Sequence, residues 1–564
     1  MDELHFDLND FLYQNEKEYK KDILRKEYNN FILKNNLNKN KFEQIINDVI
    51  SNKSQIEERR LINIDSPLFG ILSKTKDFDK IYTIYISQKN IDEFNLKEDY
   101  IILFNKLSNL NIKISSIYYS LDNKNKLDYL KELNINFNNI RKLSLKFNSC
   151  DIINDEYLKK SINIFNSFKN LEKLFLRGNE NIIKLMENVN FEELKELNLS
   201  YDNIYNINVL EKVKLDKLEI LDLYHNKISD IGIIEKVNLK KLRELDLSWN
   251  KISNINVLEK ITLDKLEKLH LKGNKISNIN IFENISFKEL KILDLSYNVI
   301  SDINVFQKAK FNKLEILNLG NNEISDKNIL DKVILDNLVI LSLYHNKLPE
   351  INVIGNVYFK KLKKLDLSAN IIPDITELEK IKFDTLEILQ LRGNQISDIN
   401  ILEKDNFKEL KELYLSENKI SDITILEGVK FDNLKILNLS KNEISDINIL
   451  TNVNFRELKK LDISENIISD IKVLEKVKFD KLEILNLSFN VISDINILKT
   501  TKFEELKELD LSYNKISDIT VLGKVKFDNL EKMYLKNSDE LEYNYPNYSS
   551  IIKKLKFEIY MENN

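Results

Sequence analysis

The sequence has little of the residues that usually separate helices and strands in compact domains, with nine glycines and four prolines among 564 residues. Its one cysteine, Cys150, has no second thiol with which to form an intramolecular disulfide, although secreted repeat proteins commonly close their ends with disulfides. No stretch approaches the roughly 18 apolar residues of a membrane-spanning helix. The first residues, Met-Asp-Glu-Leu-His-Phe-Asp, lack the basic and apolar regions of a signal peptide. We therefore expect a cytoplasmic protein.

An excess of charge of one sign is also missing. The 85 basic and 90 acidic residues leave a net charge of -5, which gives no reason to expect nucleic acid or a membrane surface as partner. The glycines form neither a G-x-G-x-x-G motif nor a phosphate-binding loop, so we expect no nucleotide cofactor. With 43% hydrophobic residues, the chain has enough apolar surface for a core, and this excludes disorder by low hydrophobicity for most of it.

What the sequence has instead is a repeat that closes with asparagine every 24 residues. Each asparagine ends the pattern Leu-x-x-Leu-x-Leu-x-x-Asn, as at Leu221, Leu223 and Asn226. The alternation of Leu221 and Leu223 with polar residues predicts a short strand with one buried face. We expect the asparagine amide to bond backbone groups beside the strand, and Asp230 to cap a short helical turn at 232–237. The repeated asparagines are Asn226, Asn250, Asn274, Asn298, Asn322, Asn346, Asn370, Asn394, Asn418, Asn442, Asn466, Asn490 and Asn514.

One repeat cannot fold alone. Ordering its backbone and side chains costs more free energy than its own buried aliphatic side chains return, so neighbouring repeats must stack and share a core. The pattern resembles that of the leucine-rich repeat family over residues 140–538. Its continuation Asn-x-Ile-x-x-Ile-x-x-Leu is similar to the subclass of the internalins and the leucine-rich regulatory subunit of protein phosphatase 1, although this repeat is longer. The resemblance implies an α/β solenoid, a horseshoe with a parallel β-sheet on its concave face and short helices or 3₁₀ turns on its convex face.

The regions outside the regular repeat divide the chain further. Residues 1–80 have apolar residues at helical spacing, such as Ile45, Ile46 and Val49, and predict a helical N-terminal region that is either a cap or a docking module. Residues 81–139 look like degenerate leucine-rich repeats, with Ile84–Ile86 and Ile117–Tyr119 as candidate strands. Residues 140–538 are the regular repeats, and residues 539–564 are expected to form a C-terminal cap.

Positions 3, 5, 7 and 8 of the nine-residue pattern are expected to face the inside of the arc. Position 7 is mostly serine, but between residues 196 and 345 aromatic residues appear at positions 7 and 8, and a row of isoleucines occupies position 3 of three successive repeats. Exposed aliphatic residues beside aromatic ones have the composition of an interface centre. The alternative is that these side chains only pack on one another along the sheet. The predicted partner-binding residues are Tyr201, Tyr224, His225, Trp249, His270, Ile292, Tyr297, Ile316, Ile340, Tyr344 and His345.

One set of residues could carry chemistry. Position 5 reads Asp222, Asp246, His270 and Asp294 in four consecutive repeats, an arrangement that could hold a metal ion or an acid–base pair. Because no nucleophile or pocket motif accompanies it, a solvated polar ladder is the favoured interpretation. We expect no enzyme activity, no bound metal and no cofactor.

These observations predict a monomeric, non-enzymatic scaffold for protein–protein interaction, whose protein partner binds on the concave sheet surface. We expect no binding of nucleic acid, membrane or small-molecule substrate. The resemblance leaves two alternatives open: a regulatory subunit of an intracellular enzyme such as a phosphatase, or a surface or host-interaction protein of internalin type.

Overall fold

The computed structural model divides into two compact units, unit 1 (Met1–Asn250 with Ile261–Leu263) and unit 2 (Lys251–Lys260 with Asp264–Asn564). The predicted helical region 1–80 lies outside the described residues except at Arg60–Asn63, which form a strand, and Cys150 also lies outside them. The residues that the structure describes are 60–63, 82–87, 114–121, 137–147, 162–178, 180–187, 189–285, 287–332, 335–354, 357–525, 527–536 and 558–560.

The strands of unit 1 form a parallel sheet in which each strand pairs with the next one in the sequence. Strands β2 and β3 cover the two candidate strands Ile84–Ile86 and Ile117–Tyr119. The strands are β1 Arg60–Asn63, β2 Tyr82–Ser87, β3 Ile114–Leu121, β4 Lys142–Phe147, β5 Lys173–Arg177, β6 Glu196–Asn198, β7 Ile220–Asp222 and β8 Glu244–Asp246. The 3₁₀ helices are η1 Phe137–Asn139, η2 Ile182–Met186, η3 Asn208–Lys212 and η4 Gly232–Lys236.

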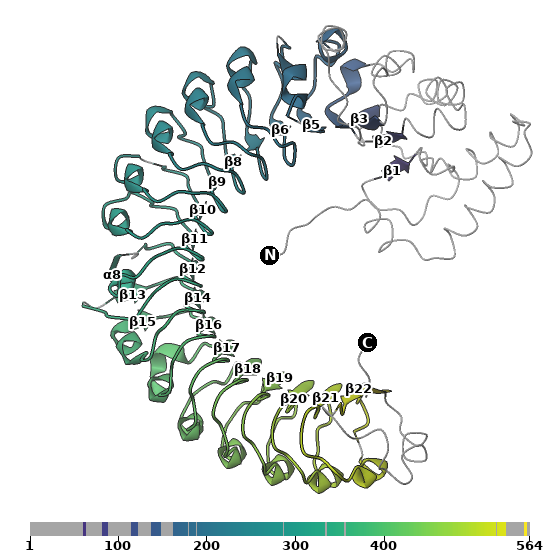
Figure 1. The fold of residues 1–564 in the computed structure, drawn as a ribbon, viewed down its shortest axis with the longest axis vertical. Helices are drawn as coiled ribbons and strands as arrows, with labels where there is room; N and C mark the ends of the chain where they lie inside the picture. Colours follow the sequence, from purple (N-terminus) through teal and green to yellow (C-terminus); the bar gives the residue numbers. More distant parts are fainter. Residues whose placement is uncertain are drawn as a thin grey trace, which may run out of the picture. The chain divides into compact units, whose positions relative to one another are not determined.

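Unit 2 repeats this plan, again with parallel strands in sequence order. Within this unit the strands line the inner side of an arc and the helical turns its outer side (Figure 1). The strands are β9 Lys268–His270, β10 Ile292–Asp294, β11 Ile316–Asn318, β12 Ile340–Ser342, β14 Lys364–Asp366, β16 Ile388–Gln390, β17 Glu412–Tyr414, β18 Ile436–Asn438, β19 Lys460–Asp462, β20 Ile484–Asn486, β21 Glu508–Asp510, β22 Lys532–Tyr534 and β23 Glu558–Tyr560.

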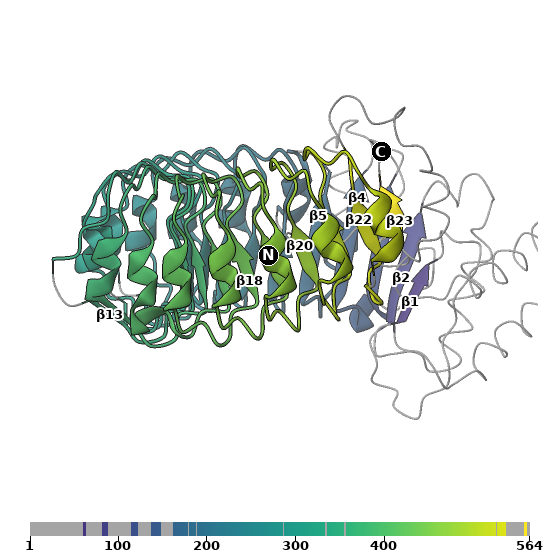
Figure 2. The same cartoon turned by 90° about the horizontal axis from the view of Figure 1, so that it is seen from below.

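Short 3₁₀ helices stack on the outer side of unit 2, as Figure 2 shows for the rungs near β18 and β20. The predicted bond from Asp230 is present in unit 1, where Asp230 Oδ1 accepts the Gly232 N–H at 2.7 Å. In other rungs an asparagine, such as Asn278, accepts the equivalent N–H. None of the described helices is long and apolar enough to cross a membrane. The turns are η5 Asn256–Lys260, η6 Asn280–Glu283, η7 Asn304–Gln307, the α-helix α8 Ile329–Lys332, η8 Thr376–Lys380, η9 Asn400–Glu403, η10 Asp405–Phe407, η11 Thr424–Glu427, η12 Asn448–Thr451, η13 Lys472–Glu475, η14 Asn496–Lys499 and η15 Thr520–Lys524.

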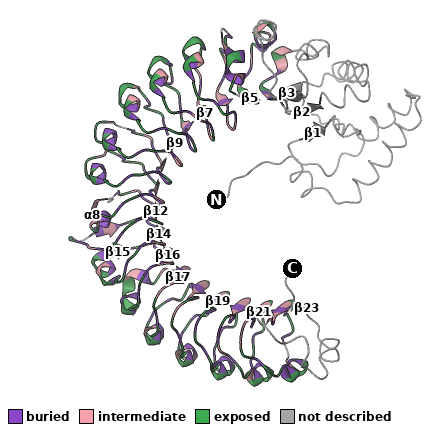
Figure 3. Ribbon diagram, viewed as in Figure 1, coloured by how far each residue is buried: buried purple, intermediate pink, exposed green. Residues whose placement is uncertain are grey.

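Residues 24 positions apart occupy equivalent places in successive repeats, which we call rungs. In unit 1, Leu197 pairs with Leu221, and Leu221 pairs with Leu245. In unit 2 the same register joins Leu269 to Leu293. These leucines are fully buried between the strands and the turns, whereas the outer side of the turns is exposed (Figure 3). The predicted leucine-rich-repeat solenoid is therefore confirmed by the strand register and by the burial of the repeated leucines.

A ladder of buried asparagines at position 9 joins each rung to the one before it. In Asn298, Oδ1 accepts the Ile276 N–H at 2.9 Å, and Nδ2 donates to the carbonyl oxygens of Leu271 and Leu295, both at 3.0 Å. The same pattern recurs around Asn346 and Asn490. A buried backbone N–H or carbonyl group without a hydrogen bond is costly. The side-chain amide stabilises the loop because it bonds backbone groups for which no neighbouring strand supplies a partner.

The two extra residues of the repeat add a buried phenylalanine or leucine to each rung. In the segment Val-x-Phe, the first and third residues point inward, as at Val357 and Phe359. Two such segments, β13 Val357–Phe359 and β15 Ile381–Phe383, form a small parallel sheet of their own. The rings of Phe359 and Phe383 stack at 5.9 Å between centroids, so the longer repeat extends the core toward the convex side.

Candidate protein-binding surface

The side chains at position 5 accept hydrogen bonds from the backbone where each strand ends. Asp222 Oδ1 accepts the Tyr224 N–H at 2.9 Å, and Asp246 and Asp294 bond the backbone of position 7 in the same way, at 2.8 and 2.9 Å. The pKa of Asp222 is raised to about 7, mainly by burial. His270 lies in the same column, and its register partner on the next strand is Asp294. These carboxyl groups thus have a backbone-binding role, and within the described ranges no group of three or more His, Cys, Asp or Glu could hold a metal ion.

Position 8 has a left-handed backbone conformation whatever residue occupies it. The φ angle is 53° at His225, 54° at Trp249 and 56° at Tyr297, close to the 67° of Gly273 and the 51° of Asn321. This conformation costs about 1–2 kcal/mol for a residue with a Cβ atom. A hydrogen bond to position 7 of the next rung holds it, as from the Tyr297 N–H to the Gly320 carbonyl at 2.9 Å. Bulky aromatic residues therefore occupy a position where the backbone favours glycine or asparagine.

The predicted residues of unit 1 form a packed aromatic cluster. The Tyr201 and His225 rings stack with their centroids 4.6 Å apart, and Tyr224 contacts Tyr201 edge-on at 5.1 Å. The Arg177 guanidinium lies over the Tyr201 ring, 5.0 Å from its centroid. Trp249, on the last rung of this unit, keeps 37% of its surface exposed. Tyr201, Tyr224 and His225 pack on one another, as the alternative interpretation requires, and still remain accessible.

In unit 2 the structure brings Tyr297 and Tyr344 together across an intervening rung. The Tyr344 ring lies over Gly320, where an added Cβ would come within 2.2 Å of the ring, and its hydroxyl donates to the Tyr297 hydroxyl. Burial and this hydrogen bond raise the pKa of Tyr344 above its usual range. Tyr297 remains 40% exposed, and the Lys272 ammonium lies 5.4 Å from its ring centroid. We call Tyr297, Gly320 and Tyr344 the tyrosine bridge.

Beside the tyrosine bridge runs the predicted isoleucine row. Ile292, Ile316 and Ile340 are register partners on β10, β11 and β12 and are half-buried, so they form one continuous apolar strip. His345 lies at position 8 of the same rung as Ile340 and Tyr344, is exposed, and has its ring centroid 6.3 Å from that of Tyr344. The structure thus assembles the predicted residues of unit 2 on neighbouring rungs.

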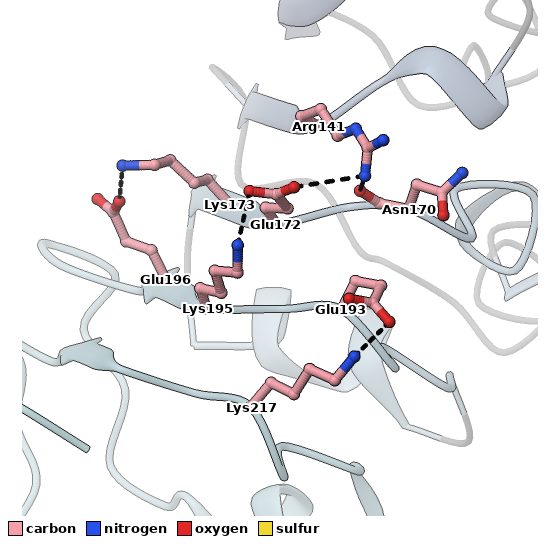
Figure 4. Close-up of polar contacts among 8 residues, drawn as sticks. All are labelled: Arg141, Asn170, Glu172, Lys173, Glu193, Lys195, Glu196 and Lys217. Carbon is pink, nitrogen blue, oxygen red and sulfur yellow. Dashed lines mark hydrogen bonds and ion pairs between the residues drawn. The ribbon is translucent and has the colours of Figure 1, made fainter. Parts of the chain in front are cut away.

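Charges beside the strands pair between rungs with alternating sign. In unit 1, Glu172 accepts from Arg141 at 3.3 Å and from Lys195 at 3.1 Å, and separate pairs join Lys173 to Glu196 and Lys217 to Glu193 (Figure 4). In unit 2, Glu387 lies between Lys363 and Lys411, and Glu483 lies between Lys459 and Lys507. Exposed pairs of this kind add little stability, about 0–1 kcal/mol each. They neutralise the lysines that would otherwise be available to bind the phosphates of a nucleic acid.

The sequence analysis missed three features of this surface. Arg177 contributes a cation to the aromatic cluster of unit 1, and Gly320 makes room for Tyr344. Phe489 and Tyr513, at position 8 in the serine-rich part of unit 2, stack at 4.1 Å between centroids. Reading position 8 as a column of its own would have revealed this last pair, because two consecutive rungs carry an aromatic residue there.

Comparisons with known proteins agree with this architecture. The family model described as "Leucine Rich repeats (2 copies)" matches residues 216–260, 384–428 and 480–524, and "Leucine Rich repeat" matches residues 312–327 and 433–447. A search of curated proteins found no match.

Solved structures with similar folds include bacterial and plant proteins. One is an internalin (inlF) of Listeria monocytogenes, with 26% identity and a TM-score of 0.44, over 60% of this chain and 85% of that one. Another is the leucine-rich repeat ectodomain of a plant membrane receptor kinase from Arabidopsis thaliana, solved with CASPARIAN STRIP INTEGRITY FACTOR 2. It has 19% identity and a TM-score of 0.46, over 75% of this chain and 56% of that one. The repeat, its asparagine ladder and the matching family models identify the chain as a leucine-rich repeat protein.

Proposed function

We propose that this protein is a non-enzymatic scaffold that binds a protein partner on the concave surface of its sheet. The observation that carries this proposal is the set of exposed aromatic side chains at position 8, where the left-handed backbone favours glycine or asparagine. The fold imposes this conformation but does not require a bulky side chain there, and we infer that the aromatic residues were selected for contact with another molecule. In unit 1 the proposed contact residues are Tyr201, Tyr224, His225 and Trp249. In unit 2 they are His270, Ile292, Tyr297, Ile316, Ile340, Tyr344 and His345.

The aromatic side chains are held in place before any partner arrives. The Tyr201–His225 stack and the tyrosine bridge fix rotamers that a flexible surface would have to order on binding. Rigid aromatic anchors beside an aliphatic strip are typical of the residues that contribute most to protein–protein affinity. The alternating charges beside the strands favour a protein over nucleic acid as the partner.

Binding without catalysis is part of the proposal, because the position 5 carboxyl groups bond their own backbone. The single cysteine of the sequence also favours a reducing compartment, and we place the interaction in the cytoplasm. Fractionation of source cells, with the protein recovered from the soluble cytoplasmic fraction, tests this location.

Affinity capture from source-cell lysate, with identification of the bound protein after cross-linking, tests the binding. The variant should replace aromatic residues by those that other rungs carry at the same position: Tyr224→Ser, Tyr344→Ser, Trp249→Asn and Tyr297→Asn. Because these residues suit the local backbone, we expect unchanged circular dichroism and loss of the captured protein. Tyr414→Asn makes the same kind of change on a distant rung and should leave capture intact. Retained capture by the fourfold variant would contradict the proposed site.

A further inference from the structure

A second exposed surface lies in unit 2, at the edge where the chain leaves strands β18 to β22. We call it the edge patch. It consists of two parallel rows of four side chains, each from consecutive rungs. The inner row, from positions 8 and 7, contains Glu465, Phe489, Tyr513 and Lys536. The outer row, from position 10, contains Glu443, Ile467, Val491 and Lys515.

Backbone hydrogen bonds make both rows continuous. In the inner row the Phe489 N–H donates to the Ser512 carbonyl at 2.8 Å, and in the outer row the Val491 N–H donates to the Ile468 carbonyl at 3.0 Å. Successive side chains are therefore one strand spacing apart, about 4.8 Å. Ile467 is 55% exposed and Phe489 is 50% exposed, the latter although its ring stacks on Tyr513. Three neighbouring rungs thus present contiguous apolar side chains to solvent, whereas Val299 and Ile371 at position 10 have polar or charged neighbours in their column.

The two rows have the same order of chemical character: acid, apolar, apolar, base. A row of this kind is complementary to a reversed copy of itself, because its acidic end meets the basic end of the copy and the apolar pairs meet in the middle. A two-fold axis produces this reversal. Glu443, Glu465 and Lys515 form no ion pair with any other residue that the structure describes, although charges beside the strands pair repeatedly. The Lys536 ammonium lies against the Tyr513 ring, 5.6 Å from its centroid.

We propose that the edge patch binds the edge patch of a second copy of this chain, and that the protein forms an isologous dimer. The two-fold axis passes between Ile467 and Val491 of the outer row, so these side chains pack against Val491 and Ile467 of the other copy. The inner row is displaced by one rung, and its Phe489, on the rung of Val491, packs beside this apolar pair. Glu443 of each copy faces Lys515 of the other copy. This proposal differs from the monomer that the sequence predicts. It is independent of the proposed partner binding, because the two surfaces share no residue.

Analytical ultracentrifugation of the full chain over about a hundredfold range of concentration tests the proposal. The wild-type protein should show a reversible monomer–dimer equilibrium. Lys515→Glu places two carboxylates opposite each other at both ends of a two-fold interface, and should raise the dissociation constant about tenfold or more. The double exchange Glu443→Lys with Lys515→Glu restores opposite charges at both contacts and should restore the dimer. Recovery by the double variant distinguishes direct pairing from a general effect of charge.

Two further variants complete the experiment. Lys419→Glu reverses a charge at position 10 outside the patch and should leave the dimer unchanged. Phe489→Asn suits the left-handed backbone, as Asn321 does, and should yield monomer with unchanged circular dichroism. A wild-type protein that stays monomeric throughout would overturn the proposal. So would a dimer that persists in Lys515→Glu and Phe489→Asn, or assembly into species larger than a dimer.

Discussion

Replacing Asp202 by asparagine should stabilise unit 1, and the gain should grow with pH. Asp202 occupies position 9, where the regular rungs carry asparagine, and its side chain is fully buried. Its Oδ1 accepts the Gly178 N–H at 2.5 Å, but its Oδ2 has no hydrogen-bond partner among the described residues. An ionised carboxylate cannot donate to a carbonyl oxygen as Asn226 Nδ2 does to Leu223 at 3.0 Å. The asparagine variant supplies that donor.

The pKa of Asp202 gives the magnitude. Burial raises it from 3.8 to about 7, although the Gly178 N–H and the positive charge of Arg177 favour the ionised form. In the unfolded chain the carboxyl group loses its proton near pH 4, whereas in the folded protein it keeps the proton until about pH 7. This contribution therefore makes the folded state progressively less stable as pH rises from about 4 to about 7, and is constant above that. The full difference is up to about 4 kcal/mol, at about 1.4 kcal/mol per pH unit.

Urea denaturation of wild type and Asp202→Asn at several pH values measures this difference directly. Comparing the two proteins at each pH cancels the titration of all other groups. We expect the variant to be more stable by about 1–2 kcal/mol at pH 5 and by up to about 4 kcal/mol at pH 8. Asp462→Asn is the matched control, because Asn438 and Asn486 hold the same position in its neighbouring rungs. A difference between Asp202→Asn and wild type that is zero or does not change with pH would refute the reasoning.

Two further substitutions test the other structural roles. Asn298→Ala leaves the Ile276 N–H and two buried carbonyl groups without their side-chain partner. It should lower the free energy of unfolding, measured by urea denaturation, by about 2–5 kcal/mol. A loss below about 1 kcal/mol would show that water replaces the amide. Gly320→Ser forces the Tyr344 ring away from the backbone, and should cost about 1–3 kcal/mol and lower the pKa of the Tyr344 phenol, measured by its ultraviolet absorbance. The reverse change Ser440→Gly should cost only about 1 kcal/mol, and an unaltered tyrosine titration in Gly320→Ser would contradict the contact between Tyr344 and Gly320.

The regular part of the fold could be predicted because one period determines most of its contacts. Leucines 24 residues apart become register partners, and the asparagine that follows them bonds the loop of the preceding rung. The additional Val-x-Phe segment was visible in the sequence, but its pairing as β13 and β15 was not. That pairing depends on how neighbouring outer loops pack, and the spacing of residues within one rung does not determine it.

The candidate site could be predicted only as a set of columns. Periodicity places Tyr297 and Tyr344 on the same face, two rungs apart, but a contact between them needs the empty volume above Gly320. The left-handed backbone of position 8 could not be predicted either, because tyrosine, histidine and tryptophan do not indicate a positive φ angle as glycine does. A repeat consensus does not predict a contact that depends on a missing side chain in a neighbouring rung.

The uniform backbone of position 8 has a consequence for how such a surface can change. Its φ angle stays between 50° and 67° whether the residue is glycine, alanine, lysine, glutamate or an aromatic residue, because hydrogen bonds from adjacent rungs determine it. One codon change can therefore alter the recognition chemistry without remodelling the scaffold. Each such exchange is tolerated separately, so a lineage could acquire a new binding specificity in single steps, with every intermediate still folded.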